Sequence, residues 1–201
     1  MNERIVVIPD THHPYQDEEA IQKVLKFIKD YKPTKIIMLG DHVDFYALSR
    51  FDKDPERITS LQGEIDSVQS LFKDLRKVFK GDITYLEGNH EYRLIKYLMR
   101  NPEISSLKNL NTVPALLGLK EYGIKYKKME IIHSVIFKHG DIVRRYSGYT
   151  ARGEFENEGT SGISGHTHRI GSHYHTNRNG QPCYRDWETQ TIPTKIGRAH
   201  V

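Results

Sequence analysis

The stretch KIIMLGDHVD, from Lys35 to Asp44, joins an apolar run to a polar cluster, and this order recurs along the chain. Lys35 to Leu39 lacks the alternation of a half-exposed strand, which is typical of a parallel strand covered on both faces. Gly40 then permits a sharp turn, so that Asp41 follows the carboxyl end of the predicted strand. The stretch therefore predicts a buried strand with acidic side chains at its end.

Two flanking segments repeat this pattern. Arg4 to Pro9 (RIVVIP) is a β-branched run that ends at Asp10, and Ile83 to Leu86 ends at Gly88-Asn89-His90. Apolar residues at helical spacing lie between the strands: Ile21, Val24, Leu25 and Ile28, then Leu61, Ile65, Val68, Phe72, Leu75 and Phe79. This alternation predicts an α/β fold with right-handed crossovers, in which ligands bind beyond the carboxyl ends of the strands.

The second half of the chain predicts a more antiparallel sheet. Tyr126 to Ile132 and Val135 to Lys138 look like paired strands, and Ser161 to Ser164 is a further short strand. Gly171 to Thr176 and Gln181 to Arg185 would form a hairpin, because Arg178-Asn179-Gly180 between them is typical of a tight turn. We therefore expect a second sheet.

Composition and length favour one soluble domain. The chain has 201 residues, of which 37% are hydrophobic and 28% charged, with a net charge of +4. No run approaches the roughly 18 apolar residues of a membrane span, and no signal peptide is evident. The single cysteine, Cys183, cannot form an internal disulfide, which fits a reducing compartment. We expect a cytoplasmic protein without a membrane partner; its oligomeric state stays open.

Two segments do not follow the pattern. Lys195 to Val201 (KIGRAHV) matches the translation of a widely used sequencing-library adapter, and Asp186 to Thr194 shows no helix or strand periodicity. We therefore predict a single domain over residues 1–184, followed by a non-native read-through tail over residues 185–201. Asn101 to Gly118 is irregular, and is either an insertion over the site or a connection.

Polar clusters at the ends of the predicted elements carry the chemistry. In chain order they are Asp10-x-His12, Gly40-Asp41-x-x-Asp44, Gly88-Asn89-His90-Glu91, His139-Gly140 and Gly165-His166-x-His168. Imidazole, carboxylate and amide oxygen together suit Mn²⁺, Fe²⁺, Zn²⁺ or Ni²⁺, whereas a soft metal would favour cysteine. One such cluster alone is a common cap or turn, but five in this order indicate a metal site.

The five clusters resemble the motifs of the calcineurin-like metallophosphoesterase superfamily, over most of the chain. The resemblance implies two mixed β-sheets packed as a sandwich flanked by helices, and two divalent metal ions, with Mn²⁺ favoured. It also implies His90 as the proton donor and Asp44 as the residue that orients it, although a hydrogen bond without kinetic role is the alternative for Asp44. The resemblance assigns Asp10, His12, Asp41 and His168 to one ion, and Asp41, Asn89, His139 and His166 to the other.

Such a site predicts metal-dependent hydrolysis of a phosphodiester or a phosphomonoester. Two divalent ions that share a carboxylate and a water lower the pKa of that water, so that a bridging hydroxide can attack phosphorus near neutral pH. The ions also stabilise charge on the phosphoryl oxygens, while the leaving oxygen needs a proton.

Other functions within or beyond this class stay open. A DNA- or RNA-processing nuclease of the same superfamily is the main alternative, and nucleic acid or a nucleotide is then the partner. A protein phosphatase is disfavoured, because Phe45 and Glu87 stand where those enzymes carry arginines. A non-catalytic scaffold is disfavoured too, because such relatives tend to lose ligands and none is missing here.

Several basic side chains outside the ligand set have weaker assignments. His173 and His175 share one face of a predicted strand, which fits an extra metal, a substrate contact or simply an exposed hairpin. His13 and His42 either line the site or are exposed. The arginines that could bind a phosphate are Arg50, Arg93, Arg144, Arg145 and Arg152.

Overall fold

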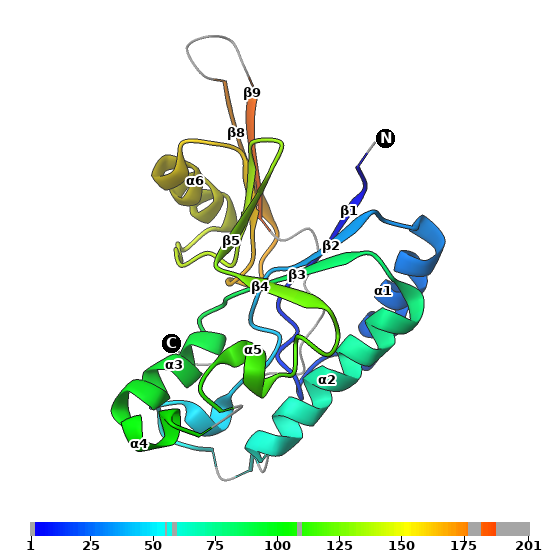
Figure 1. The fold of residues 1–201 in the computed structure, drawn as a ribbon. Coiled ribbons are helices and arrows are strands. Elements are labelled where there is room, and N and C mark those ends of the chain that lie inside the picture. Colours follow the sequence, from blue (N-terminus) through cyan, green and yellow to red (C-terminus); the bar gives the residue numbers. More distant parts are fainter. Residues whose placement is uncertain (1–2, 55, 58–59, 108–109, 177–181, 188–201) are drawn as a thin grey trace.

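The computed structural model describes residues 3–54, 56–57, 60–107, 110–176 and 182–187, which form two packed sheets with helices on the outside (Figure 1). The first sheet has the order β1-β2-β3-β4, and its described strands are all parallel. These strands are β1 (Ile5–Ile8), β2 (Lys35–Met38), β3 (Asp82–Leu86) and β4 (Ile124–Lys127). The α/β sandwich is therefore confirmed, with a first sheet that is parallel rather than mixed.

The second sheet is mixed and has the order β5-β6-β7-β9-β8. Its strands are β5 (Met129–Ile132), β6 (Val135–Lys138), β7 (Gly162–Ser164), β8 (Gly171–Thr176) and β9 (Pro182–Trp187). Strands β6, β7 and β9 run parallel to one another, whereas β5 and β8 pair antiparallel with their neighbours. The predicted hairpin partners β8 and β9 are thus paired, and the predicted turn at residues 178–180 lies outside the described residues.

Strand β2 shows why the first sheet needs a continuous apolar run. Ile36 and Met38 pack into the core formed with α1 (Glu18–Tyr31) and α2 (Leu61–Val78). Ile37 and the following Leu39 belong to the other core, where they meet Phe137 of β6. Both faces of β2 are buried, so neither set of alternating side chains can be polar. Helices α1 and α2 cover one side of the molecule (Figure 1).

Helix α6 (Ser147–Glu158) covers the second sheet and packs against β8 and β9 (Figure 1). The sequence does not predict this helix, because its buried face is made of small and polar residues instead of an apolar stripe. One of them, Glu154, accepts hydrogen bonds from the backbone of Asp141 and Ile142 and pairs with Lys138 at 2.7 Å. Polar contacts thus hold this helix in place, and its sequence lacks the apolar periodicity by which a packed helix is usually recognised.

The segment from Tyr126 to Ile132 is not one strand, which corrects the prediction. Strand β4 ends at Lys127 in the first sheet, and β5 begins at Met129 in the second. The chain changes sheet here because Tyr126 packs beside the core under α1 and α2, whereas Ile132 packs between the sheets. Strand β9 also continues to Trp187, two residues past the predicted end at Arg185; residues 188–201 lie outside the described residues.

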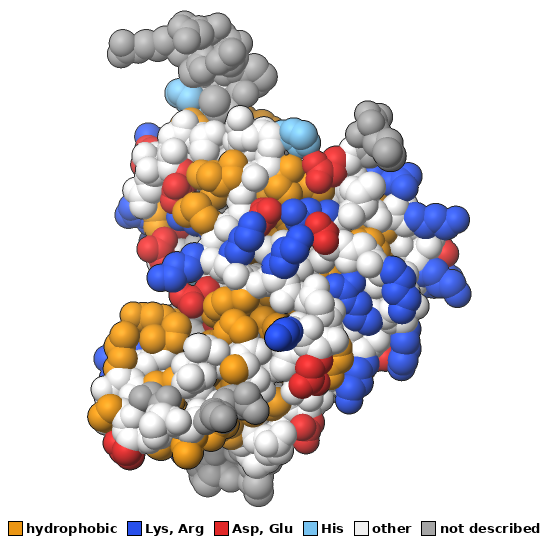
Figure 2. Space-filling view, viewed as in Figure 1, with side chains coloured by type: hydrophobic (Ala, Val, Ile, Leu, Met, Phe, Trp, Pro, Cys, Tyr) orange, Lys and Arg blue, Asp and Glu red, His pale blue; other side chains and the backbone are white. Residues whose placement is uncertain are grey.

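The described residues of the segment 101–118 form a packed connection. They follow α3 (Glu91–Arg100) and contain α4 (Pro102–Ser105) and α5 (Val113–Leu116), both of which contact α3; the short helix η1 (Tyr46–Leu48) lies nearby. Val113 and Leu117 are buried in the same core as α1 and α2. Hydrophobic side chains gather on the surface over α3 to α5, whereas Lys and Arg gather over α1 and α2 (Figure 2).

Within the described residues, every helix is too short or too polar to cross a membrane.

Candidate metal centre

The predicted ligands meet beyond the carboxyl ends of the first sheet's strands. Asp10 follows β1, Asp41 follows β2 and Asn89 follows β3, while His139 comes from the end of β6. The loops after β1 and β2 are joined by backbone hydrogen bonds, since Thr11 N and His12 N both donate to Asp41 O, at 3.2 and 2.9 Å. Parallel strand ends therefore bring distant motifs together, as the topology predicts.

The loops pass very close to one another. A Cβ atom on Gly40 would lie 2.7 Å from Gly88 N, and Gly40 itself has φ +98°, which favours glycine. Four predicted ligands also have positive φ, a conformation that clusters at functional sites. They are His12 (47°), Asp41 (51°), His166 (87°) and His168 (53°). The backbone thus adopts energetically unfavourable conformations at the predicted ligand residues.

Asp10, His12 and His168 form one cluster. His168 Nε2 lies 3.0 Å from His12 Nε2 and 3.1 Å from Asp10 Oδ2. Ligand atoms bound at roughly 2.1 Å to one ion are about 3 Å apart, so this spacing fits a shared cation. The Asp10 and His12 side chains are buried, whereas the side chain of His168 is 34% exposed and forms the open side of the cluster.

Asp41, Asn89, His139 and His166 form the second cluster. His139 Nε2 lies 2.8 Å from Asn89 Oδ1, 3.2 Å from Asp41 Oδ2 and 3.2 Å from His166 Nδ1. The other ring nitrogen, Nδ1, donates to the backbone oxygen of Leu39 at 3.0 Å. A carbonyl partner of this kind directs the Nε2 lone pair of a neutral imidazole toward a metal.

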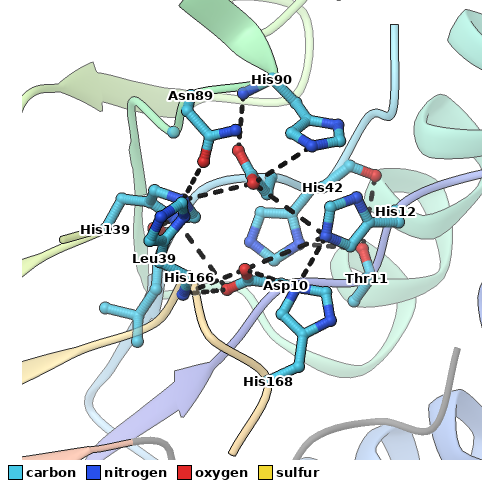
Figure 3. A network of polar contacts seen from close by, with 12 residues as sticks. Asp10, Thr11, His12, Leu39, His42, Asn89, His90, His139, His166 and His168 are labelled. Atoms are coloured by element: carbon cyan, nitrogen blue, oxygen red, sulfur yellow. Dashed lines mark hydrogen bonds and ion pairs between the residues drawn. The ribbon is translucent and has the colours of Figure 1, made fainter. Parts of the chain in front are cut away.

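Asp41 lies between the two clusters. Its Oδ2 atom is 3.2 Å from His139 Nε2 and 4.0 Å from His12 Nε2. Figure 3 shows His139 and His166 on the left and His12 on the right, with Asp10 between His166 and His168 in the lower part of the view. A third group that could hold an ion is His12 with Asp41 and His90. The predicted ligand residues are thus all brought within one small region.

Burial and ion pairing together set the charge of this region. Burial opposes ionisation of Asp10, but the positive charge of His139 and the hydrogen bond from His168 lower its pKa to about 2. Burial likewise disfavours charged His139, but Asp41 and Asp10 raise its pKa to about 10. The buried carboxylates are therefore stable in their ionised form only next to positive charge, which either protonated histidines or bound divalent ions can provide.

His90 is anchored by Asp44 at one edge of the centre. His90 Nδ1 donates to the backbone oxygen of Asp44 at 2.8 Å and lies 3.1 Å from Asp44 Oδ1. Arg93 Nη1 donates to the same carboxylate oxygen, and Arg93 Nη2 lies 2.9 Å from His90 Nε2. Burial opposes protonation of His90, but Asp41 and Asp44 outweigh it and raise the pKa.

Glu91 holds the loops together, a role the sequence analysis did not assign. Its carboxylate is buried and accepts from Asp41 N and Gly88 N, each at 2.9 Å, and from His42 N at 3.1 Å. The hydroxyl of Tyr85 donates to it as well. The only sequence signal for Glu91 is its position in the first turn of a helix. Acidic residues are common there because they interact favourably with the helix dipole, and they are usually exposed to solvent, so the position does not indicate a buried acceptor.

The remaining histidines take structural positions. His13 and His42 are buried, contrary to the exposed alternative; His42 Nδ1 lies 2.9 Å from Thr11 Oγ1. Burial lowers the pKa of each to about 3, so both are neutral. His173 and His175 contact the ring of Phe155 on α6, and neither joins a metal-capable group among the described residues.

The family model described as calcineurin-like phosphoesterase matches residues 3–170, which include every predicted ligand. Two curated relatives are the Gene 54 proteins of Mycobacterium phages D29 and L5. Each is 31% identical over 186 residues, covering 88% of this chain and 73% of the relative. Together with this family match, the Asp and His clusters fit a binuclear divalent metal site.

Proposed function

Because the chain belongs to the calcineurin-like phosphoesterase family, we propose that it is a dinuclear metal-dependent hydrolase of a phosphodiester or a phosphomonoester. The observation that carries the proposal is the position of Asp41, whose Oδ2 atom lies between two His-rich clusters. Asp10, His12 and His168 with Asp41 would hold one ion. Asn89, His139 and His166 with Asp41 would hold the other, and Mn²⁺ suits these nitrogen and oxygen donors.

Two bound divalent ions would supply hydroxide from water near neutral pH and neutralise the phosphoryl oxygens. The protein side chains supply the rest. As the P–O bond to the leaving group breaks, the leaving oxygen needs a proton, and His90 Nε2 faces the same region as Asp41 Oδ2, at 3.7 Å. The bond from His90 Nδ1 to Asp44 fixes which nitrogen is free to donate.

Arg93 is placed to bind a non-bridging oxygen of the phosphoryl group. Its guanidinium is held by the Asp44 carboxylate and reaches His90, so an anion bound beside His90 would meet a fixed positive charge. A guanidinium suits this task because it offers parallel N–H donors to an oxyanion. While Nη1 stays on Asp44, the Nη2 donor would exchange His90 Nε2 for a phosphate oxygen and leave that nitrogen for the leaving oxygen.

The test is hydrolysis of bis-p-nitrophenyl phosphate and of p-nitrophenyl phosphate by the purified, monodisperse chain, first with Mn²⁺ and then with a chelator. We expect turnover that the chelator abolishes and added Mn²⁺ restores. The ratio of diester to monoester turnover assigns the substrate class. Lack of turnover in protein shown by elemental analysis to hold two metal ions would contradict the proposal.

A further inference from the structure

A pocket of about 470 Å³ lies between α6 and the loop that follows β6, outside the metal centre. Its lining combines arginine and tyrosine side chains. The lining residues are Arg144, Arg145, Tyr146, Tyr149, Arg152, Gly153 and Glu156. We call this the Arg–Tyr surface, and we propose that it binds single-stranded nucleic acid, so that the phosphoester cut at the metal centre is an internucleotide linkage. This inference rests on the proposed function.

The Arg–Tyr surface is continuous with two ligand-bearing loops. Arg144 lies five residues after His139, a separation of at most about 18 Å even for extended chain. Arg169, which directly follows His168, donates from Nη2 to the backbone oxygen of Arg144 at 2.7 Å and from Nη1 to that of Arg145 at 2.8 Å. A strand bound on the surface would therefore run close to both sides of the metal centre.

Two tyrosines offer faces on which bases can stack. The side chains of Tyr146 and Tyr149 are 57% and 58% exposed, and their ring centroids are 5.6 Å apart at an interplanar angle of 63°. The Arg145 guanidinium lies 5.5 Å from the Tyr146 ring centroid, which holds both groups at the surface. Stacking of this kind is tolerant of sequence and needs unpaired bases, which favours a single strand over a duplex.

The charge of the surface suits a phosphate backbone. Its three lining arginines face one acid, Glu156, which pairs with Arg152 at 2.7 Å. Among the residues that the structure describes, neither Arg144 nor Arg145 pairs with a carboxylate, so both guanidinium groups are available to phosphates. A lone phosphate would not need two exposed aromatic rings, whereas a nucleotide chain uses both features.

A second pocket provides a matched control. It lies between α1 and α2, and its lining includes Lys26, Lys29 and Lys77 but no aromatic residue. If positive charge alone attracted the nucleic acid, replacing Lys26 and Lys29 would weaken its binding as much as replacing arginines of the Arg–Tyr surface. We expect the lysine replacements to leave the affinity unchanged.

The experiment is fluorescence anisotropy of a labelled oligothymidylate of about 20 nucleotides with the full chain, in chelator so that binding is separated from hydrolysis. We expect Tyr149→Ala to weaken binding roughly five- to hundredfold, the equivalent of one stacked base, and Tyr149→Phe to bind like the unsubstituted chain. Arg145→Ala should lower the slope of log K against log salt by about one. Lys26→Ala with Lys29→Ala should change neither. Circular dichroism confirms folding of each variant.

The inference is overturned if Tyr149→Ala binds as tightly as the unsubstituted chain, if a duplex binds as well as the single strand, or if polyphosphate competes as well as the oligonucleotide. The bis-p-nitrophenyl phosphate assay separates the two proposals. Metal-dependent turnover without oligonucleotide binding would refute the Arg–Tyr surface and leave the phosphoesterase. Oligonucleotide binding without any metal-dependent hydrolysis would refute the proposed function, and with it the internucleotide substrate, and would leave the Arg–Tyr surface as a binding site alone.

Discussion

The two sheets contribute to the candidate metal centre in different ways. The loops of the first sheet are buried and tied together, because Glu91 accepts hydrogen bonds from the loops after both β2 and β3. The loop after β7 in the second sheet is more exposed, and His166 N reaches the first sheet through Asp10 Oδ2 at 3.1 Å. The part of the centre built by the first-sheet loops is therefore preformed. The part built by the loop after β7 is held by fewer contacts, which bound metal ions would complete.

The largest expected effect comes from Asp41, the first-sheet residue that reaches both clusters. Asp41→Ala should abolish phosphoester hydrolysis and deplete both metal ions, because each cluster loses a carboxylate ligand. Metal content by elemental analysis, together with turnover of bis-p-nitrophenyl phosphate, checks this.

His168→Ala is the second-sheet counterpart, and it should remove only one equivalent of metal, since His168 touches the Asp10 and His12 cluster alone. Equal metal loss in the two variants would contradict the difference between the sheets.

His90→Ala should slow turnover about 10²- to 10⁴-fold while both ions stay bound, because it removes a proton donor and not a ligand. Leaving groups of low pKa need less protonation, so the loss should shrink when the chromogenic leaving group is made more acidic. His90 also lies within ligand reach of Asp41 and His12. Loss of a metal ion in His90→Ala would therefore assign His90 to the ligands instead.

Glu91→Gln tests whether the first-sheet loops need their shared acceptor. Glutamine keeps one carbonyl oxygen, but its NH₂ group would face backbone N–H groups that now donate to the second carboxylate oxygen of Glu91. We expect a loss of about 10- to 100-fold in metal affinity or activity, as for other residues that position ligands. Isothermal titration with Mn²⁺ measures it, and an unchanged affinity and turnover would show that the loops hold without Glu91.

Glu64 gives the smallest effect, on stability alone. It is fully buried on α2, away from the second sheet, and accepts from Tyr46 N and Ala47 N. Burial raises its pKa from 4.5 to about 7, so the native state binds the proton more tightly than the unfolded chain. Below about pH 4.5 the Glu64 carboxyl is protonated in both states and the free energy of unfolding is highest. As the pH rises through 7 the buried carboxyl ionises, and the free energy of unfolding falls by at most about 3 kcal/mol.

Glu64→Gln should therefore flatten the fall in unfolding free energy between pH 5 and pH 8, since glutamine does not titrate. Its single amide oxygen can accept only one of the two backbone hydrogen bonds, so the slope with pH, and not the absolute stability, is the quantity to compare. Urea unfolding of metal-free protein at both pH values measures the difference between the two chains. An identical slope in the variant would assign the pH dependence to other groups.

The sequence predicted the first sheet well because its strands are buried on both faces. Such strands are continuous apolar runs, and Lys35 to Leu39 is recognisable without a structure. Helix α6 lacks such a signal, since its buried residues include Thr150, Gly153 and Glu154. The change of sheet at Lys128 carries no sequence signal either, because residues on both sides of that point favour β structure and predict one continuous strand.

By itself, the sequence determined which donor types are available, the order in which they follow the strands, and hence the class of chemistry. Only the tertiary structure decided their partners: that Asp41 Oδ2 lies between His12 and His139, that Leu39 O orients His139, and that Glu91 joins two loops. The reason is physical. Donor identity is local to each motif, whereas ångström-scale distances between motifs depend on how the two sheets pack, and that is a property of the whole chain.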